Sequence, residues 1–196
     1  YPLEVRETEG GVLLDNRQYS LEAVPVEHRV PTLAYRLVEK PRPGRFDVAA
    51  AERLGVPPGP LFKRLQEGAP VVTPSDTTVL PEQVLGSPRP GRKFVYMVDT
   101  RPCREGVDFA RGADLLIHDA MFDDELADEA VRRRHSTARE AATMAASAGV
   151  SRLLLTHISP RYQDISTFVS QAREVFPETR VARDLDVYEI AFRQEE

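Results

Sequence analysis

The chain has 196 residues, one cysteine, 41% hydrophobic and 29% charged residues, and a formal net charge of −5. This length favours a single domain with its own core, and one cysteine excludes an internal disulfide and a cysteine-rich zinc site. No apolar run approaches the roughly 20 residues that cross a bilayer, and no signal peptide is visible at the start, which lacks a methionine. We therefore expect part of a longer, cytoplasmic protein without a membrane segment.

The first predicted elements are two strands. Residues 18–27 alternate between apolar and polar side chains, which is the period of a half-buried strand. Leu33–Glu39 is a second strand-like run, and the Pro- and Gly-rich residues 41–44 end it.

Residues 40–90 predict an inserted, flexible arm within the single domain of residues 1–196. Asp47 can cap a short helix that runs to about Leu54, and residues 61–67 favour a second short helix. A rigid proline-rich turn lies between the two helices. We expect this arm to be too small to bury a core of its own.

The same segment has a local excess of positive charge. Residues 40–68 contain six basic and three acidic side chains, a net charge of +3 within an acidic chain. Such a segment can contact a polyanion, although a solvated surface arm gives the same pattern.

The second half of the chain alternates between predicted strands and helices. Thr137 and Glu140 form a capping-box pattern before a helix that Gly149 ends. The alternation indicates an α/β (α+β) fold with layered sheets. The expected strands cover residues 93–98, 115–117 and 152–156 and a final pair over 180–192, and the expected helices cover residues 123–134, 137–148 and 165–175.

Several metal-binding or acid–base side chains follow the predicted strands. Asp99 could bridge two cations, and His28 and His157 could each supply a neutral imidazole nitrogen to zinc or manganese. Two metals about 3.5–4 Å apart can activate water and stabilise displacement at phosphorus. His135, at a predicted helix start, could donate a proton to the leaving oxygen.

Each of these residues also has a structural interpretation. A single histidine at a strand end is more often hydrogen-bonded within a loop than bound to a metal. Residues 135–137 could form only a helix cap, and residues 99–102 could form only a turn. We favour a structural role for His118.

Five motifs follow one another along the chain: Glu27-His28 with the strand Leu33–Glu39, the segment Gly55–Gly68 with Gly59-Pro60, Asp99-Thr100-Arg101, His135-Ser136-Thr137, and Thr156–Ser159 with Arg161-Tyr162. They resemble, in the same order, those of ribonuclease Z, the tRNA 3′-processing endonucleases of the metallo-β-lactamase superfamily.

The resemblance implies the C-terminal half of an αββα sandwich with a protruding substrate-binding arm. It implies a metal-dependent endoribonuclease that uses two Zn²⁺ ions, with Mn²⁺ possible, acts on precursor tRNA and forms a homodimer. The implied roles are metal binding for His28, Asp99 and His157, catalysis for His135 oriented by Asp119, and substrate binding for Gly59, Pro60, Lys63, Arg64 and Arg161.

Three departures from the family pattern affect the expected site. The His-x-His-x-Asp-His signature is absent, Val98 replaces the usual glycine, and Asp119 replaces a glutamate. A β-branched residue adopts positive φ poorly, so we expect an altered loop before Asp99. The shorter Asp119 is expected to lengthen or lose its contact with His135.

The missing signature leaves too few metal ligands. With Asp99 bridging, each metal has two protein ligands, whereas catalytic zinc sites usually have three. We therefore expect this chain alone to bind metal weakly and to be inactive. The alternatives are a non-catalytic tRNA-binding or dimerisation module and a metallo-phosphodiesterase that acts on small esters.

Overall fold

A computed structural model describes residue 2 and residues 4–192. The described residues up to Glu39 and from Arg92 onwards form one compact unit, and Lys40–Gly91 forms a second. Among the described residues, no helix combines the length and apolar character needed to span a membrane.

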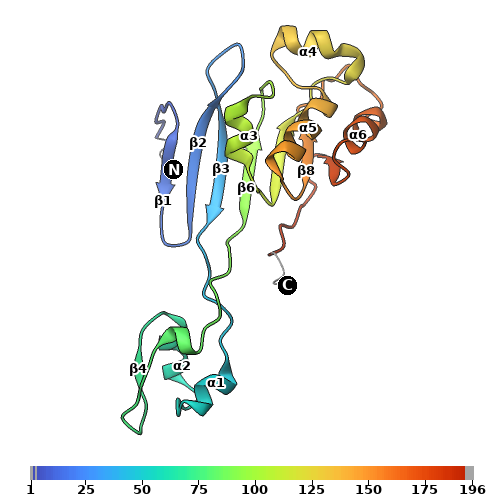
Figure 1. The fold of residues 1–196 in the computed structure, drawn as a ribbon. Coiled ribbons are helices and arrows are strands. Elements are labelled where there is room, and N and C mark those ends of the chain that lie inside the picture. Colours follow the sequence, from blue (N-terminus) through green and yellow to red (C-terminus); the bar gives the residue numbers. More distant parts are fainter. Residues whose placement is uncertain (1, 3, 193–196) are drawn as a thin grey trace. The chain divides into compact units, whose positions relative to one another are not determined.

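The larger unit is built on a seven-stranded sheet in the order β1-β2-β3-β6-β7-β8-β9 (Figure 1). Neighbouring strands from β1 to β6 are antiparallel, and those from β6 to β9 are parallel. The strands are Gly11–Asp15 (β1), Tyr19–Val26 (β2), Thr32–Glu39 (β3), Lys93–Met97 (β6), Leu115–Asp119 (β7), Leu153–Thr156 (β8) and Thr179–Val181 (β9).

Helices cover one face of this sheet and enclose the main core. In α5, buried alanines let the helix approach the sheet closely, and Thr137 and Gly149 cap its ends as predicted. Phe168 of α6 is fully buried in the same core. The helices of this unit are Arg104–Ala110 (α3), Ala127–Arg133 (α4), Ala138–Ala148 (α5) and Ser166–Arg173 (α6), and a 3-10 turn, Asp124–Leu126 (η2), precedes α4.

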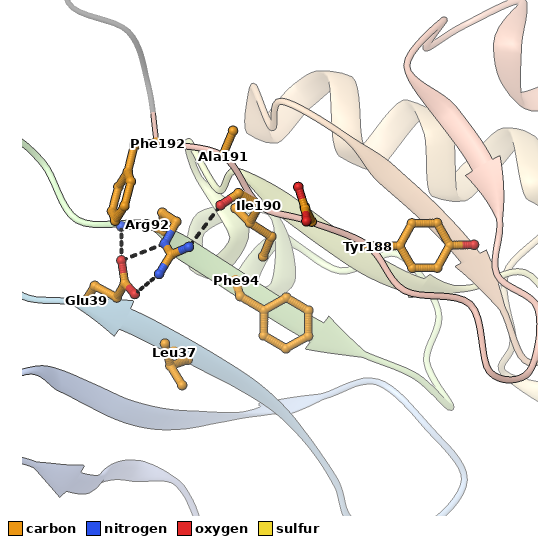
Figure 2. A pocket seen from close by; sticks show the side chains of 9 residues that line it. Leu37, Glu39, Arg92, Phe94, Tyr188, Ile190, Ala191 and Phe192 are labelled. Carbon is orange, nitrogen blue, oxygen red and sulfur yellow. Dashed lines mark hydrogen bonds and ion pairs between the residues drawn. The ribbon is translucent and has the colours of Figure 1, made fainter.

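The opposite face of the sheet also carries apolar side chains. Tyr35 and Tyr96 are register partners on β3 and β6 and are 38% and 40% exposed. Leu37 and Phe94 are a second pair on this face and line a cavity of about 630 Å³ (Figure 2). A sheet that is apolar on both faces, with helices on one, has the layering of half an αββα sandwich, as predicted.

The predicted strand pair over residues 180–192 is wrong. Of the described residues in this segment, only those at the end of β9 form a strand. The carbonyl of Ile190 accepts a hydrogen bond from Arg92 Nη1 at 3.0 Å (Figure 2), and the carbonyl of Glu189 accepts one from Arg152. Arginine side chains thus satisfy carbonyls that a strand partner would otherwise bind.

The smaller unit, Lys40–Gly91, has a core of its own, so the expectation that it could not bury one is wrong. Leu65 and Val79 are fully buried in this cluster. Gly44 lets the two sides of the unit meet, because a Cβ there would lie 1.9 Å from the carbonyl oxygen of Gly86. The unit contains Val48–Arg53 (α1), Pro60–Gln66 (α2), Val71–Val72 (β4), Thr78–Val79 (β5) and the 3-10 turn Pro81–Gln83 (η1).

Candidate metal centre and acid–base site

The candidate site lies where three parallel strands end. Asp99 follows β6, Asp119 is the last residue of β7, and His157 follows β8. Because β6, β7 and β8 are neighbours and run in the same direction, their carboxyl ends meet at one edge of the sheet. His135 joins them from the loop before α5.

Four of these side chains form a compact set of donor atoms. Ligand atoms of Asp99, Asp119, His135 and His157 all lie within 4.8 Å of one another. His157 Nε2 is 3.0 Å from Asp99 Oδ1, a separation that suits two ligands of one ion. The set offers imidazole nitrogen and carboxylate oxygen, so it fits a divalent cation such as zinc or manganese.

Asp119 connects the loops of the site. It is completely buried, and its carboxylate accepts hydrogen bonds from His135 Nδ1 at 2.7 Å, Thr100 N at 3.1 Å and Met121 N at 2.9 Å. The expectation that an aspartate would lengthen or lose the contact with His135 is therefore wrong. The loops approach closely enough to compensate for the missing methylene.

The electrostatics of the cluster favour an ionised Asp119. Burial alone would raise its pKa, but hydrogen bonds from His135 and His157 outweigh burial and hold the pKa well below its ordinary value. The hydrogen bond to Asp119 in turn raises the pKa of His157, against the smaller effect of desolvation. Together, Asp119 and His157 therefore favour an ionised carboxylate beside a readily protonated imidazole.

His135 is held in one tautomer. A carboxylate oxygen can only accept, so the contact with Asp119 places a proton on Nδ1 and leaves the lone pair of the neutral ring on Nε2. The His135 ring lies between those of His28 and His157, with centroid distances of 4.8 and 5.1 Å. The contact that the sequence predicts for Asp119 and His135 is present, and their catalytic roles stay predictions.

His28 lies beside the four-residue set but is not one of its members. Its Nδ1 is 2.9 Å from the carbonyl oxygen of Arg134, and Arg134 Nη1 donates to the carbonyl of His28 at 3.2 Å. Because a carbonyl only accepts, Nε2 of neutral His28 carries the lone pair that a metal would need. Its role as a ligand stays a prediction.

The backbone departure at Val98 has a simple structural answer. Asp99 itself adopts the left-handed conformation, with φ of 54°, and His157 does the same with φ of 61°. Val98 is not among the described residues with positive φ. The sharp turn that presents the carboxylate thus falls one residue later than we expected, on a residue type that tolerates it.

The other predicted residues divide between the two units. Arg161 lies with its guanidinium 5.2 Å from the ring centroid of Phe122, and its Nε donates to Ser159. His118 is fully buried, and burial lowers its pKa, consistent with a structural role. Gly59, Pro60, Lys63 and Arg64 belong to the smaller unit, at and within α2.

Sequence reasoning missed Arg101 as part of the site. Its guanidinium donates to the carbonyl of His135 and to both carboxylate oxygens of Glu140. The capping-box pattern pointed to Glu140, but nothing local in the sequence pairs it with a residue 39 positions away.

Known proteins resemble this chain in both sequence and fold. The Beta-lactamase superfamily domain matches residues 68–158. The chain is 47% identical to Ribonuclease Z of Methanosarcina acetivorans, with 100% of this chain and 64% of that protein covered. It is 49% identical to Ribonuclease Z of Myxococcus xanthus, with 90% of this chain and 58% of that protein covered.

A solved structure leads to the same group. The crystal structure of human tRNase Z, short form, matches with a TM-score of 0.55 and 25% identity, over 94% of this chain and 48% of that chain. This chain spans about three fifths of the length of the two Ribonuclease Z relatives named above. It belongs to the metallo-β-lactamase superfamily, among the relatives of ribonuclease Z.

Proposed function

We propose that this chain is the C-terminal part of a metal-dependent endoribonuclease that hydrolyses the phosphodiester 3′ of the tRNA acceptor stem. The observation that carries the proposal is the buried 2.7 Å contact between His135 and Asp119, inside a four-donor cluster. Its support is a sequence 47% identical to a protein named Ribonuclease Z.

The acid–base part of the reaction follows from the tautomer of His135. Protonated at both nitrogens, His135 can give its Nε2 proton to the leaving oxygen while Asp119 holds Nδ1–H and stabilises the imidazolium. Arg161, with its guanidinium beside Phe122 at the same edge, is the candidate contact for the phosphate.

Asp99, His157 and, through Nε2, His28 are the residues of this chain that would hold metal. When bound, divalent cations supply Lewis-acid activation of water and phosphate. We propose two zinc ions, or manganese, per complete site. Because this chain offers few ligands for two ions, we expect it to bind them weakly. Further ligands would have to come from a segment equivalent to the part of its relatives that this chain does not span.

The proposed substrate is precursor tRNA, and the proposed assembly is a cytoplasmic homodimer. The smaller unit supplies Lys63, whose side chain is 78% exposed, together with Arg64 on the same helix. These cations suit contacts to tRNA phosphates, which dominate recognition because A-form RNA hides its deep groove.

The test is cleavage of a 3′-extended tRNA precursor with zinc or manganese. It compares this chain alone, the chain mixed with the unmatched portion of the Methanosarcina acetivorans relative, and the same mixture carrying His135→Ala. We expect cleavage at the acceptor end only in the mixture, and its loss in the variant. Binding of tRNA without cleavage in the mixture would instead indicate a non-catalytic module.

A further inference from the structure

Arg101 joins three segments that carry site residues. Its side chain is only 16% exposed. Its Nη1 donates to the carbonyl of His135 at 2.8 Å, and its backbone N donates to the carbonyl of Glu27 at 2.9 Å. Arg101 therefore ties the loop that carries His135 to the residue that precedes His28.

Glu140 fixes the guanidinium in place. Its carboxylate accepts from Arg101 Nη1 at 2.7 Å and from Nη2 at 2.5 Å. The same carboxylate accepts from the backbone N of Thr137 at 2.9 Å, which closes the capping box of α5. The start of α5 and the carbonyl of His135 are thus held by one planar group.

This arrangement requires arginine rather than any cation. A guanidinium presents several N–H donors in one rigid plane, so it can form the two-oxygen contact with Glu140 and still reach the carbonyl of His135. A lysine ammonium keeps the charge but cannot hold these acceptors in a fixed planar geometry.

We propose that Arg101 is a positioning residue, which acts through the carbonyl of His135 and through Glu140 to hold the His135 imidazole against Asp119. The proposal rests on the proposed function for its effect on rate, but its effect on the imidazole is independent of that function. Replacing a residue that orients the ligands of a metal site typically lowers metal affinity or activity about 10- to 100-fold.

The experiment compares Arg101→Met, Arg101→Lys and the matched control Arg139→Met. Arg139 lies on α5 next to Glu140 and forms ion pairs with Asp124 at 2.6 Å and Glu174 at 2.7 Å, but it has no contact with His135 among those described. In the 196-residue chain at fixed pH, we would record imidazole ¹H–¹⁵N spectra. In the mixture that cleaves tRNA, we would measure kcat and KM.

Arg101→Met should shift the His135 imidazole signals and broaden its Nδ1–H resonance, while Arg139→Met leaves both unchanged. Arg101→Met should also lower kcat about 10- to 100-fold with little change in KM, and Arg101→Lys should recover only part of this loss of kcat. If Arg101→Met does not fold, Arg101→Lys must show the same spectral change in weaker form.

Unchanged His135 signals in a folded Arg101 variant, or equal losses of kcat in Arg101→Met and Arg139→Met, would overturn the proposal. If the unsubstituted mixture cleaves no tRNA, the proposed function fails. The spectra then still decide whether Arg101 positions His135.

Discussion

At the residue scale, Asp119 determines the geometry of the candidate site. Its carboxylate accepts from His135 and from the backbone N–H groups of Thr100 and Met121, so one buried group connects the loops after β6 and β7 to the loop before α5. A buried carboxylate is stable only when hydrogen bonds and nearby positive charge replace its hydration. The same contacts that make Asp119 tolerable therefore fix the orientation of His135.

Replacing Asp119 with asparagine should destabilise the chain by roughly 1.5–3 kcal/mol at pH 7, the usual value for hydrogen bonds to a charged group. Because the folded pKa lies below its ordinary value, the carboxylate stabilises the native state above the unfolded pKa, near 4. This benefit is lost progressively as the pH falls further. Urea unfolding of both proteins from pH 7 to pH 3 tests this, and a constant difference would contradict it.

His157 leads to a prediction about metal binding. Its contact with Asp119 raises its pKa, and a metal requires the neutral imidazole, so binding must release a proton. The zinc affinity of this chain should therefore rise with pH, by about tenfold per unit below the folded pKa. Calorimetric titration in two buffers with different ionisation heats measures the released protons. The same affinity at pH 6 and pH 8 would count against the prediction.

At the scale of elements, the start of α5 links helix stability to the site. Thr137 accepts from the backbone N of Glu140 at 3.2 Å, and Glu140 accepts from the backbone N of Thr137. Thr137→Ala should cost about 1 kcal/mol, the usual effect of losing an N-cap. The midpoint of urea unfolding measures it. Thr143→Ala is the control, because Thr143 bonds only within the helix among the described contacts, and an equal loss there would exclude a capping effect.

The smaller unit should respond separately to loss of its core. Leu65 is completely buried among the apolar side chains of Lys40–Gly91, so Leu65→Ala should cost about 2–5 kcal/mol of local stability. Hydrogen exchange should then show lost protection within residues 40–91 and unchanged protection in β6–β8. Val72→Ala, at a position 55% exposed, is the control. Equal loss of protection in both units would show that they unfold together.

At the scale of the whole molecule, the distribution of charge predicts how binding depends on salt. Replacing Lys63 and Arg64 with alanine should weaken tRNA binding and reduce the slope of log K against log salt by about one unit per lost phosphate contact. Filter binding from 50 to 300 mM salt measures both effects. Arg104→Ala removes a 91% exposed cation from the larger unit and should leave the slope unchanged. An unchanged slope in the double variant would exclude these side chains as phosphate contacts.

Local patterns predicted the elements whose signals are local. Asp47 and Thr137 cap the helices expected to begin there. Helix α3 was missed because Cys103 occupies its N-cap without a side-chain hydrogen bond and Gly106 lies within its short span. Strand β1 was missed because all five of its residues are exposed, so it lacks the alternation of a half-buried strand.

The candidate site shows the same division. The residue types at two strand ends predicted Asp99 and His157, and a predicted helix start pointed to His135; the fold brings all three together. The distance between Asp119 and His135 depends on the packing of two loops, and side-chain length alone gave the wrong expectation. The role of Arg101 arises from a contact between distant segments, and no periodic pattern encodes such a contact.

The left-handed backbone at Asp99, Arg134 and His157 has an evolutionary consequence. A side chain in this conformation costs roughly 1–2 kcal/mol, and glycine avoids that penalty. Drift under selection for thermal resistance alone should therefore replace these residues with glycine early. Under the proposed function, selection for the reaction should instead keep the side chains of Asp99 and His157. Deep mutational scanning should therefore favour glycine at these two positions under selection by heat and disfavour it under selection for tRNA maturation.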